Sequence, residues 1–308
     1  MSATRPIHNP LGSLDQASAW LNSEPLAAAA LRGRVVLVDF WTYSCVNWLR
    51  TLPYVRAWAE RYADRGLVVV GVHAPEFGFE HDLENVRHAV GELGVGYPVV
   101  IDNDFAIWRS FDNHYWPAVY LVDGGGQVRF HHFGEEAYEE TERAIQQLLD
   151  VEEELVRVGA DGVAAAADWD TLRSPETYVG YLRGERLSES RADGLALNEW
   201  ALAGRWTVEE ESAVLETASG SIAYRFQARD LNLVLAPPAW DAPVRFCVRL
   251  DGQPPGSAHG LDIDESGEGT VSEPRMYQLV RQRGPVAECH FEITFLDPGA
   301  RAYVFTFG

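Results

Sequence analysis

The sequence predicts an α/β domain followed by an all-β sandwich or jelly-roll domain, and three observations support this. A chain of 308 residues is long enough for two domains of ordinary size. In the first half, continuous apolar runs alternate with amphipathic segments, which is typical of a mostly parallel sheet covered by helices. From about residue 177, short alternating runs separated by Gly, Pro and Asp replace that pattern. We therefore expect domains at 1–156 and 177–308.

Strands and helices alternate along the first domain and end in a β-hairpin and a final helix. The expected helices lie at 13–22, 45–65, 80–93, 104–111 and 136–156. The expected strands lie at 34–41, 67–73, 97–102, 118–123 and 127–133, with a turn at 124–126 between the last two. This order implies a sheet with an antiparallel edge.

The second domain follows a segment at 157–176 that has no periodicity and is expected to be a linker. The runs that predict strands lie at 221–228, 231–235, 244–250, 276–281, 289–295 and 302–307. Almost no helical spacing occurs among them, which favours a β-sandwich or jelly roll.

Composition excludes several functions. All 25 cationic residues are arginine, so neither a Schiff-base lysine nor a phosphate-binding Walker lysine is available. The net charge of -21 disfavours nucleic acid as a partner. The chain starts without an export signal, and no apolar run reaches the ~18 residues of a membrane span, so we expect no membrane segment and a cytoplasmic location. His131 and His132 alternate across a strand, and no other grouping has ligand spacing, so neither a metal nor another cofactor is expected.

The chemistry is expected at Cys45. Cys45 stands where a buried strand ends and the next helix begins, and a helix start stabilises a thiolate. Asp39 lies within the preceding apolar strand, where an isolated carboxylate is costly to bury. Trp116-Pro117 precedes a later strand, and this proline is a predicted cis site facing the cysteine.

These residues resemble the thioredoxin fold. The resemblance is carried by Asp39–Trp41, by Cys45 and by the proline before the later strand, and longer matching stretches are WLNSEPL (20–26), LRGRVVLVDFWTYSC (31–45), GVHAPEF (71–77), YWPAVYLVD (115–123), FGEEAY (133–138) and SPETYVG (174–180). Together they are similar to the TlpA/ResA group of thiol-disulfide oxidoreductases, and within it to the soluble C-terminal region of DipZ-type proteins.

The resemblance implies a thioredoxin-like domain followed by a carbohydrate-binding-module-like jelly roll. It also implies roles for individual side chains. Cys45 would be the nucleophile, Glu76 would tune its pKa, and Pro117 would bind the substrate backbone. Asp39 would correspond to the buried carboxylate that handles the proton of a second cysteine.

The chain departs from the family at that second cysteine, because the Cys-x-x-Cys motif reads Cys45-Val46-Asn47-Trp48. Disulfide reduction by this fold needs one thiol to attack and another to release the mixed disulfide. Cys247 and Cys289 fall in predicted strands, where buried, inert thiols are expected. Ordinary dithiol reductase activity is therefore not expected.

Three functions stay open. The first is monothiol chemistry at Cys45, through a mixed disulfide or a sulfenic acid, with a thiol- or disulfide-bearing protein or a small thiol as partner. The second is a non-catalytic module that binds a peptide at an aromatic rim, or carbohydrate through the β domain, the latter on resemblance alone. The rim would consist of Trp41, Tyr43, Trp48 and Trp116. The third is a peroxiredoxin-like peroxidase, because Thr42 stands three residues before Cys45.

Overall fold

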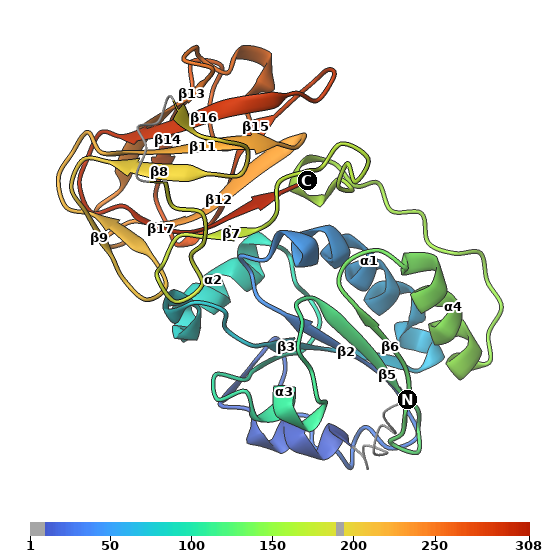
Figure 1. The fold of residues 1–308 in the computed structure, drawn as a ribbon. Coiled ribbons are helices and arrows are strands. Elements are labelled where there is room, and N and C mark those ends of the chain that lie inside the picture. Colours follow the sequence, from blue (N-terminus) through green and yellow to red (C-terminus); the bar gives the residue numbers. More distant parts are fainter. Residues whose placement is uncertain (1–9, 189–193) are drawn as a thin grey trace, which may run out of the picture. The chain divides into compact units, whose positions relative to one another are not determined.

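The computed structural model describes residues 10–188 and 194–308, which form two compact units (Figure 1). The first unit runs from Met1 to Ala164 and the second from Ala165 to Gly308. The first is an α/β thioredoxin-like unit and the second consists of antiparallel sheets. Among the described residues, no helix combines the length and apolar character needed to cross a membrane.

The first unit is built on a six-stranded sheet in the order β1-β4-β3-β2-β5-β6. Its strands are β1 (Ala19–Leu21), β2 (Val35–Trp41), β3 (Leu67–His73), β4 (Val99–Ile101), β5 (Ala118–Val122) and β6 (Val128–Phe133). Strands β2, β3 and β4 are parallel, whereas β1, β5 and β6 pair antiparallel with their neighbours. All seven residues of β2 are buried, because helices cover both faces of the sheet at its centre.

Helices form a layer on each side of this sheet (Figure 1). They are α1 (Val46–Tyr62), α2 (Leu83–Glu92), α3 (Ala106–Ser110) and α4 (Tyr138–Leu149), with short 3₁₀ turns η1 (Pro10–Gln16), η2 (Ala63–Arg65), η3 (Gly78–His81) and η4 (Gly162–Ala164). One core lies under α1, α2 and α4 and contains Trp58, Val86 and Ile145. The other lies under η1 and α3 and contains Leu14 and Ile107.

Two predicted helices of the first unit were wrong in part. Residues 13–22 do not form one helix, because η1 ends at Gln16 and β1 then pairs with β4, where Ser18 N–H donates to the Ile101 carbonyl. The final helix ends at Leu149 rather than at residue 156. Its C-cap residue Asp150 has a φ of 54°, a left-handed conformation that stops a helix.

The second unit consists of two antiparallel sheets that share one core. The first sheet has the order β15-β12-β17-β10-β9, with β7 beside β17, and the second has the order β14-β13-β16-β11-β8. The strands are β7 (Thr177–Tyr178), β8 (Trp200–Ala203), β9 (Trp206–Val208), β10 (Ala213–Leu215), β11 (Ser221–Gln227), β12 (Asp230–Ala236), β13 (Val244–Leu250), β14 (Glu268–Val271), β15 (Arg275–Arg281), β16 (Glu288–Phe295) and β17 (Arg301–Phe307).

Aromatic contacts join the two sheets into a sandwich. Tyr224 of β11 and Phe291 of β16 lie 4.9 and 6.0 Å from Phe305 of β17, measured between ring centroids. The six strands expected from the sequence are present, and the short strands β7, β8, β9, β10 and β14 were missed. The jelly-roll topology stays a prediction.

Candidate functional site

Cys45 lies at the junction between β2 and α1, as the sequence predicts. The backbone turns after Trp41, and Cys45 N–H donates to the Thr42 carbonyl at 3.3 Å. Cys45 is the N-cap residue of α1, and its carbonyl accepts the first helical hydrogen bond from Leu49 at 3.0 Å. Cys45 is in no disulfide, is half-buried and packs against the core under α1. A sulfur at this position lies near the first N–H groups of the helix, whose partial positive charge favours a thiolate, and it keeps access to solvent.

Pro117 lies at the same edge of the sheet. Ala118 of β5 pairs with Phe40 of β2, so the residue before Ala118 lies level with the end of β2. The Trp116-Pro117 peptide bond is cis, which confirms the sequence prediction.

Trp48 occupies the position of the second family cysteine and contacts Asp39 directly. The indole Nε1–H of Trp48 donates to Asp39 Oδ2 at 3.0 Å, and the Tyr97 hydroxyl donates to the same oxygen at 3.3 Å. Asp39 and Trp48 are both fully buried. Burial raises the pKa of the Asp39 carboxyl to about 7, although the two hydrogen bonds oppose that rise. The carboxyl that would serve a second cysteine is therefore bound to an indole.

Glycine at position 71 allows the rings of Trp41 and Tyr97 to pack closely against the strand that carries it. Trp41 stacks on Trp48 with ring centroids 4.2 Å apart and planes 20° from parallel. A Cβ atom at Gly71 would lie 2.9 Å from Trp41 Nε1 and 2.9 Å from Tyr97 Cε2, which is too close for either contact. Only glycine fits between these two rings.

A buried carboxylate, that of Glu80, also supports the turn before Cys45, whereas the role of Glu76 in tuning the Cys45 pKa stays a prediction. Ser44 Oγ donates to Glu80 Oε1 at 2.6 Å. The backbone N–H groups of Glu76 and Phe77 donate to Glu80 Oε2 at 2.6 and 3.0 Å. Burial raises the pKa of Glu80 to about 7, and the bond from Ser44 opposes the rise. The side chain of Glu76 is half-buried, and its backbone N–H donates to Glu80 Oε2.

The predicted aromatic rim lies mostly in the core. Trp41, Tyr43 and Trp48 are at most 4% exposed, so they cannot form an exposed binding surface. Trp116 is half-buried; its Nε1–H donates to the Ala74 carbonyl at 3.1 Å. The prediction of a peptide-binding rim was therefore wrong for these three rings. Trp41 lies on β2, Trp48 on α1 and Tyr43 in the turn between them, and all three belong to the core under α1.

Comparison with known proteins places both units. Residues 13–149 match the Redoxin family, and residues 174–308 match the family described as thioredoxin-like C-terminal domain. The chain is a thioredoxin-like Redoxin unit followed by a thioredoxin-like C-terminal unit, and it is similar to thiol-disulfide oxidoreductases. Its relatives include protein DipZ of Mycobacterium bovis, 37% identical over 234 residues, which cover 71% of this chain and 34% of DipZ. The chain thus spans about a third of the length of that relative.

Two further relatives resemble the first unit. The thiol-disulfide oxidoreductase YkuV of Bacillus subtilis is 29% identical over 143 residues, which cover 46% of this chain and 96% of YkuV. A thioredoxin-like protein solved in solution in its oxidised form is 29% identical with a TM-score of 0.42, and the match covers 49% of this chain and 100% of that chain.

The other two cysteines, Cys247 and Cys289, are not placed to form a disulfide with each other. Cys289 faces the core of the second unit, where burial raises the pKa of its thiol to about 11. Cys247 is half-buried and pairs with Thr294, five residues from Cys289 along β16. Because five residues of strand span ~16 Å, these two thiols cannot form a disulfide. The expected burial is confirmed for Cys289 and is only partial for Cys247.

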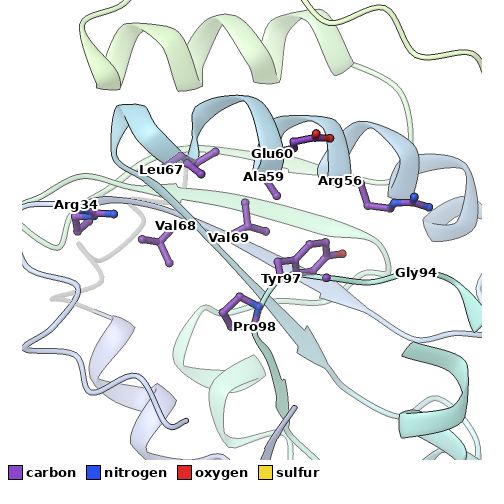
Figure 2. A pocket seen from close by; sticks show the side chains of 12 residues that line it. Arg34, Arg56, Ala59, Glu60, Leu67, Val68, Val69, Gly94, Tyr97 and Pro98 are labelled. Atoms are coloured by element: carbon purple, nitrogen blue, oxygen red, sulfur yellow. The ribbon is translucent and has the colours of Figure 1, made fainter. Parts of the chain in front are cut away.

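A cavity of about 440 Å³ lies at the end of the sheet where β2 and β3 begin. Figure 2 shows residues that line it, which come from the first residues of β3, the second half of α1, the residue before β2 and the loop before β4, among them Leu67, Arg56, Arg34 and Tyr97. Leu67 pairs with Val35 at the start of β2, whereas Cys45 follows the end of β2. Tyr97 lines this cavity, and its hydroxyl also donates to Asp39.

Residues able to hold a metal do not converge in the described residues. Within 10–188 and 194–308, no three His, Cys, Asp or Glu side chains come together as ligands would. His73 is buried between Trp41 and Tyr43, and burial lowers its pKa to about 3. Its imidazole is therefore neutral at physiological pH and acts as a packing ring.

Proposed function

We propose that this chain exchanges disulfides through Cys45 alone. In the first step the Cys45 thiolate attacks a disulfide of the partner. A new bond forms between Cys45 Sγ and one partner sulfur, the partner's disulfide breaks, and the other sulfur leaves as a thiolate that takes a proton from water. In the second step a low-molecular-weight thiol attacks the mixed disulfide, regenerates Cys45 and carries away the partner sulfur.

The buried bond between Trp48 and Asp39 is the observation that carries this proposal. In a dithiol enzyme a second thiol attacks the mixed disulfide from this position. Here the position holds an indole whose only polar atom is already bonded at 3.0 Å to the carboxyl that would accept a thiol proton. The adduct on Cys45 therefore lasts until an external thiol arrives. Such thiols are abundant in the cytoplasm, which is the location we propose.

Two observations disfavour the alternatives. Three of the four rings of the expected peptide-binding rim are buried, which leaves a non-catalytic module without its surface. The peroxidase rests on the position of Thr42 alone, and the Thr42 side chain is completely buried. Carbohydrate binding by the second unit has no support beyond resemblance.

The test uses a chain in which Cys45 is the only thiol, made by Cys247→Ser and Cys289→Ser. It is incubated with oxidised glutathione and its intact mass is followed. We expect one glutathione adduct per chain that persists after the oxidant is removed and that excess reduced thiol releases. The matched control is Cys45→Ser, which keeps the other two cysteines and is expected to form no adduct at neutral pH. An unmodified single-thiol chain would contradict the proposal.

A further inference from the structure

One largely buried ion pair in the first unit has no part in the chemistry described so far. Arg50 Nη1 and Glu135 Oε1 lie 2.7 Å apart, with side chains 2% and 6% exposed. Burial raises the pKa of Glu135, and the neighbouring guanidinium opposes that rise. Such a pair costs desolvation energy that well-packed apolar residues would avoid, so stability alone does not account for it.

Arg50 lies in the helix that begins at Cys45, and Glu135 lies in the segment that contacts Pro117. Arg50 lies on α1, five residues after Cys45 at its start. Glu135 follows Gly134, whose backbone N–H donates to the Pro117 carbonyl at 2.8 Å. The ion pair therefore connects the helix that begins at Cys45 with the segment that is hydrogen-bonded to Pro117.

Two more contacts hold the same segment. The Tyr138 ring stacks on Tyr54 of α1 with centroids 3.7 Å apart and planes 8° from parallel. His132 Nε2 lies 3.0 Å from the Glu135 carbonyl. We call residues 132–138 the Pro117 bracket. It joins β6 to α4, and it is fixed to α1 by one charged and one aromatic contact.

Two exposed aromatic rings lie beside the Pro117 hydrogen bond, one before it in the chain and one within the bracket. Tyr115 is 55% exposed and Phe133 is 38% exposed, and their ring centroids lie 5.2 Å apart. Tyr115 precedes Trp116-Pro117, and Phe133 precedes Gly134, so this pair borders the hydrogen bond between Gly134 and Pro117. An extended polypeptide offers a backbone and apolar side chains to such an edge, whereas a small disulfide offers neither.

We propose that Arg50 and Glu135 are positioning residues that fix the backbone at Pro117 relative to Cys45, and that they thereby favour disulfides carried by an extended polypeptide over small disulfides. This inference rests on the proposed function, because it assumes exchange at Cys45. A polypeptide must meet Cys45 and Pro117 together, so its rate depends on their spacing. A small disulfide needs only Cys45. Misplacement of a substrate by about 1 Å is enough to lower a rate by as much as ~100-fold.

The test compares two probes that release the same chromophore. One is 5,5′-dithiobis(2-nitrobenzoate), and the other is a short linear peptide whose single cysteine carries a thionitrobenzoate disulfide. The background is the chain with Cys247→Ser and Cys289→Ser. The variants are Glu135→Gln and the double variant Arg50→Met with Glu135→Leu. The double variant is expected to fold, because replacing both partners of a buried pair by apolar residues is often neutral for stability. Glu135→Gln instead removes only the negative charge that faces Arg50.

We expect the peptide rate to fall about tenfold in both variants and the small-disulfide rate to stay within about twofold. The matched control is Arg61→Met with Glu153→Leu, which removes a partly exposed ion pair between α1 and the segment after α4 and is expected to change neither rate. Equal losses with both probes, or no loss with either, would overturn the positioning role. A parent chain that reacts with neither probe would instead overturn the proposed function, and with it this inference.

Discussion

The interiors of the two units differ in how they treat polar groups. In the first unit, Asp39, His73 and Glu80 are completely buried, and they lie on the strand and turns around Cys45. In the second unit, the core between the sheets is apolar, and its buried Asp230 stands at the start of β12 in ion pairs with Arg229 and Arg281. The second unit thus pairs its buried Asp230 with two cations, whereas burial raises the pKa values of Asp39 and Glu80 around Cys45.

The same contrast separates the cysteines. Cys289 is held among apolar side chains that keep its thiol protonated, and Cys45 stands at a helix start with access to solvent. Departures from an apolar, fully paired interior are expected where a protein performs chemistry. This difference supports the proposal that the reactive thiol is Cys45 of the first unit.

The largest effect should come from Trp48→Cys. The substitution removes a buried indole, its stack on Trp41 and its bond to Asp39, and we expect it to lower the free energy of unfolding of the first unit by ~3–5 kcal/mol. Urea unfolding followed by circular dichroism measures this loss. Trp240→Cys is the control in the second unit, because its ring is 52% exposed, and it should cost under ~1 kcal/mol. Equal losses of stability in the two variants would contradict the tighter packing expected around Trp48.

The next effect concerns pH. The pKa of Asp39 is raised from 3.8 to about 7 in the fold, so its protonated form stabilises the fold, fully below pH ~4, and this stability is lost as pH rises through 7. Asp39→Asn removes the loss. Between pH 5 and pH 8 we expect the variant to gain ~2–3 kcal/mol relative to the parent chain. Denaturant unfolding at the two pH values measures it. A difference that stays constant with pH would show that Asp39 ionises normally.

A smaller effect should follow Gly71→Ala. The added methyl group would meet Trp41 and Tyr97 at 2.9 Å, and we expect a loss of ~1–3 kcal/mol in thermal or urea unfolding. Gly91→Ala in α2 is the matched control, because nothing lies within 4 Å of its added carbon. Alanine there should stabilise the helix by up to ~1 kcal/mol. Effects of the same sign would contradict the close packing of the cluster.

The smallest effect should come from Cys289→Ser. A hydroxyl replaces a buried thiol that lies 3.6 Å from the Ala287 carbonyl, so a loss of about 1 kcal/mol is expected. The amount of glutathione adduct formed at neutral pH should not change, because the raised pKa keeps this thiol unreactive. Intact mass after oxidised glutathione checks this, and a reduced adduct would move part of the chemistry into the second unit.

Much of this site follows from the sequence, because its elements are local. The buried run at 35–41, the helix after Cys45 and the proline before β5 each have a short-range signal. Glu80 does not. Its burial depends on Ser44, which lies 36 residues earlier, and an acidic side chain in a loop is normally exposed. The partners Arg50 and Glu135 are 85 residues apart, and strand β1 exists only through its pairing with β4. Such contacts arise when the sheet assembles.

The stack of Trp41 on Trp48 also gives the molecule an optical signal of its own. Two indoles at 4.2 Å couple their electronic transitions, and one of them donates directly to a carboxyl that titrates near neutral pH. Ionisation of Asp39 places a full negative charge against the Trp48 N–H and changes its absorption and emission. The protonation of this buried group is therefore readable by fluorescence and near-ultraviolet circular dichroism in the unlabelled chain.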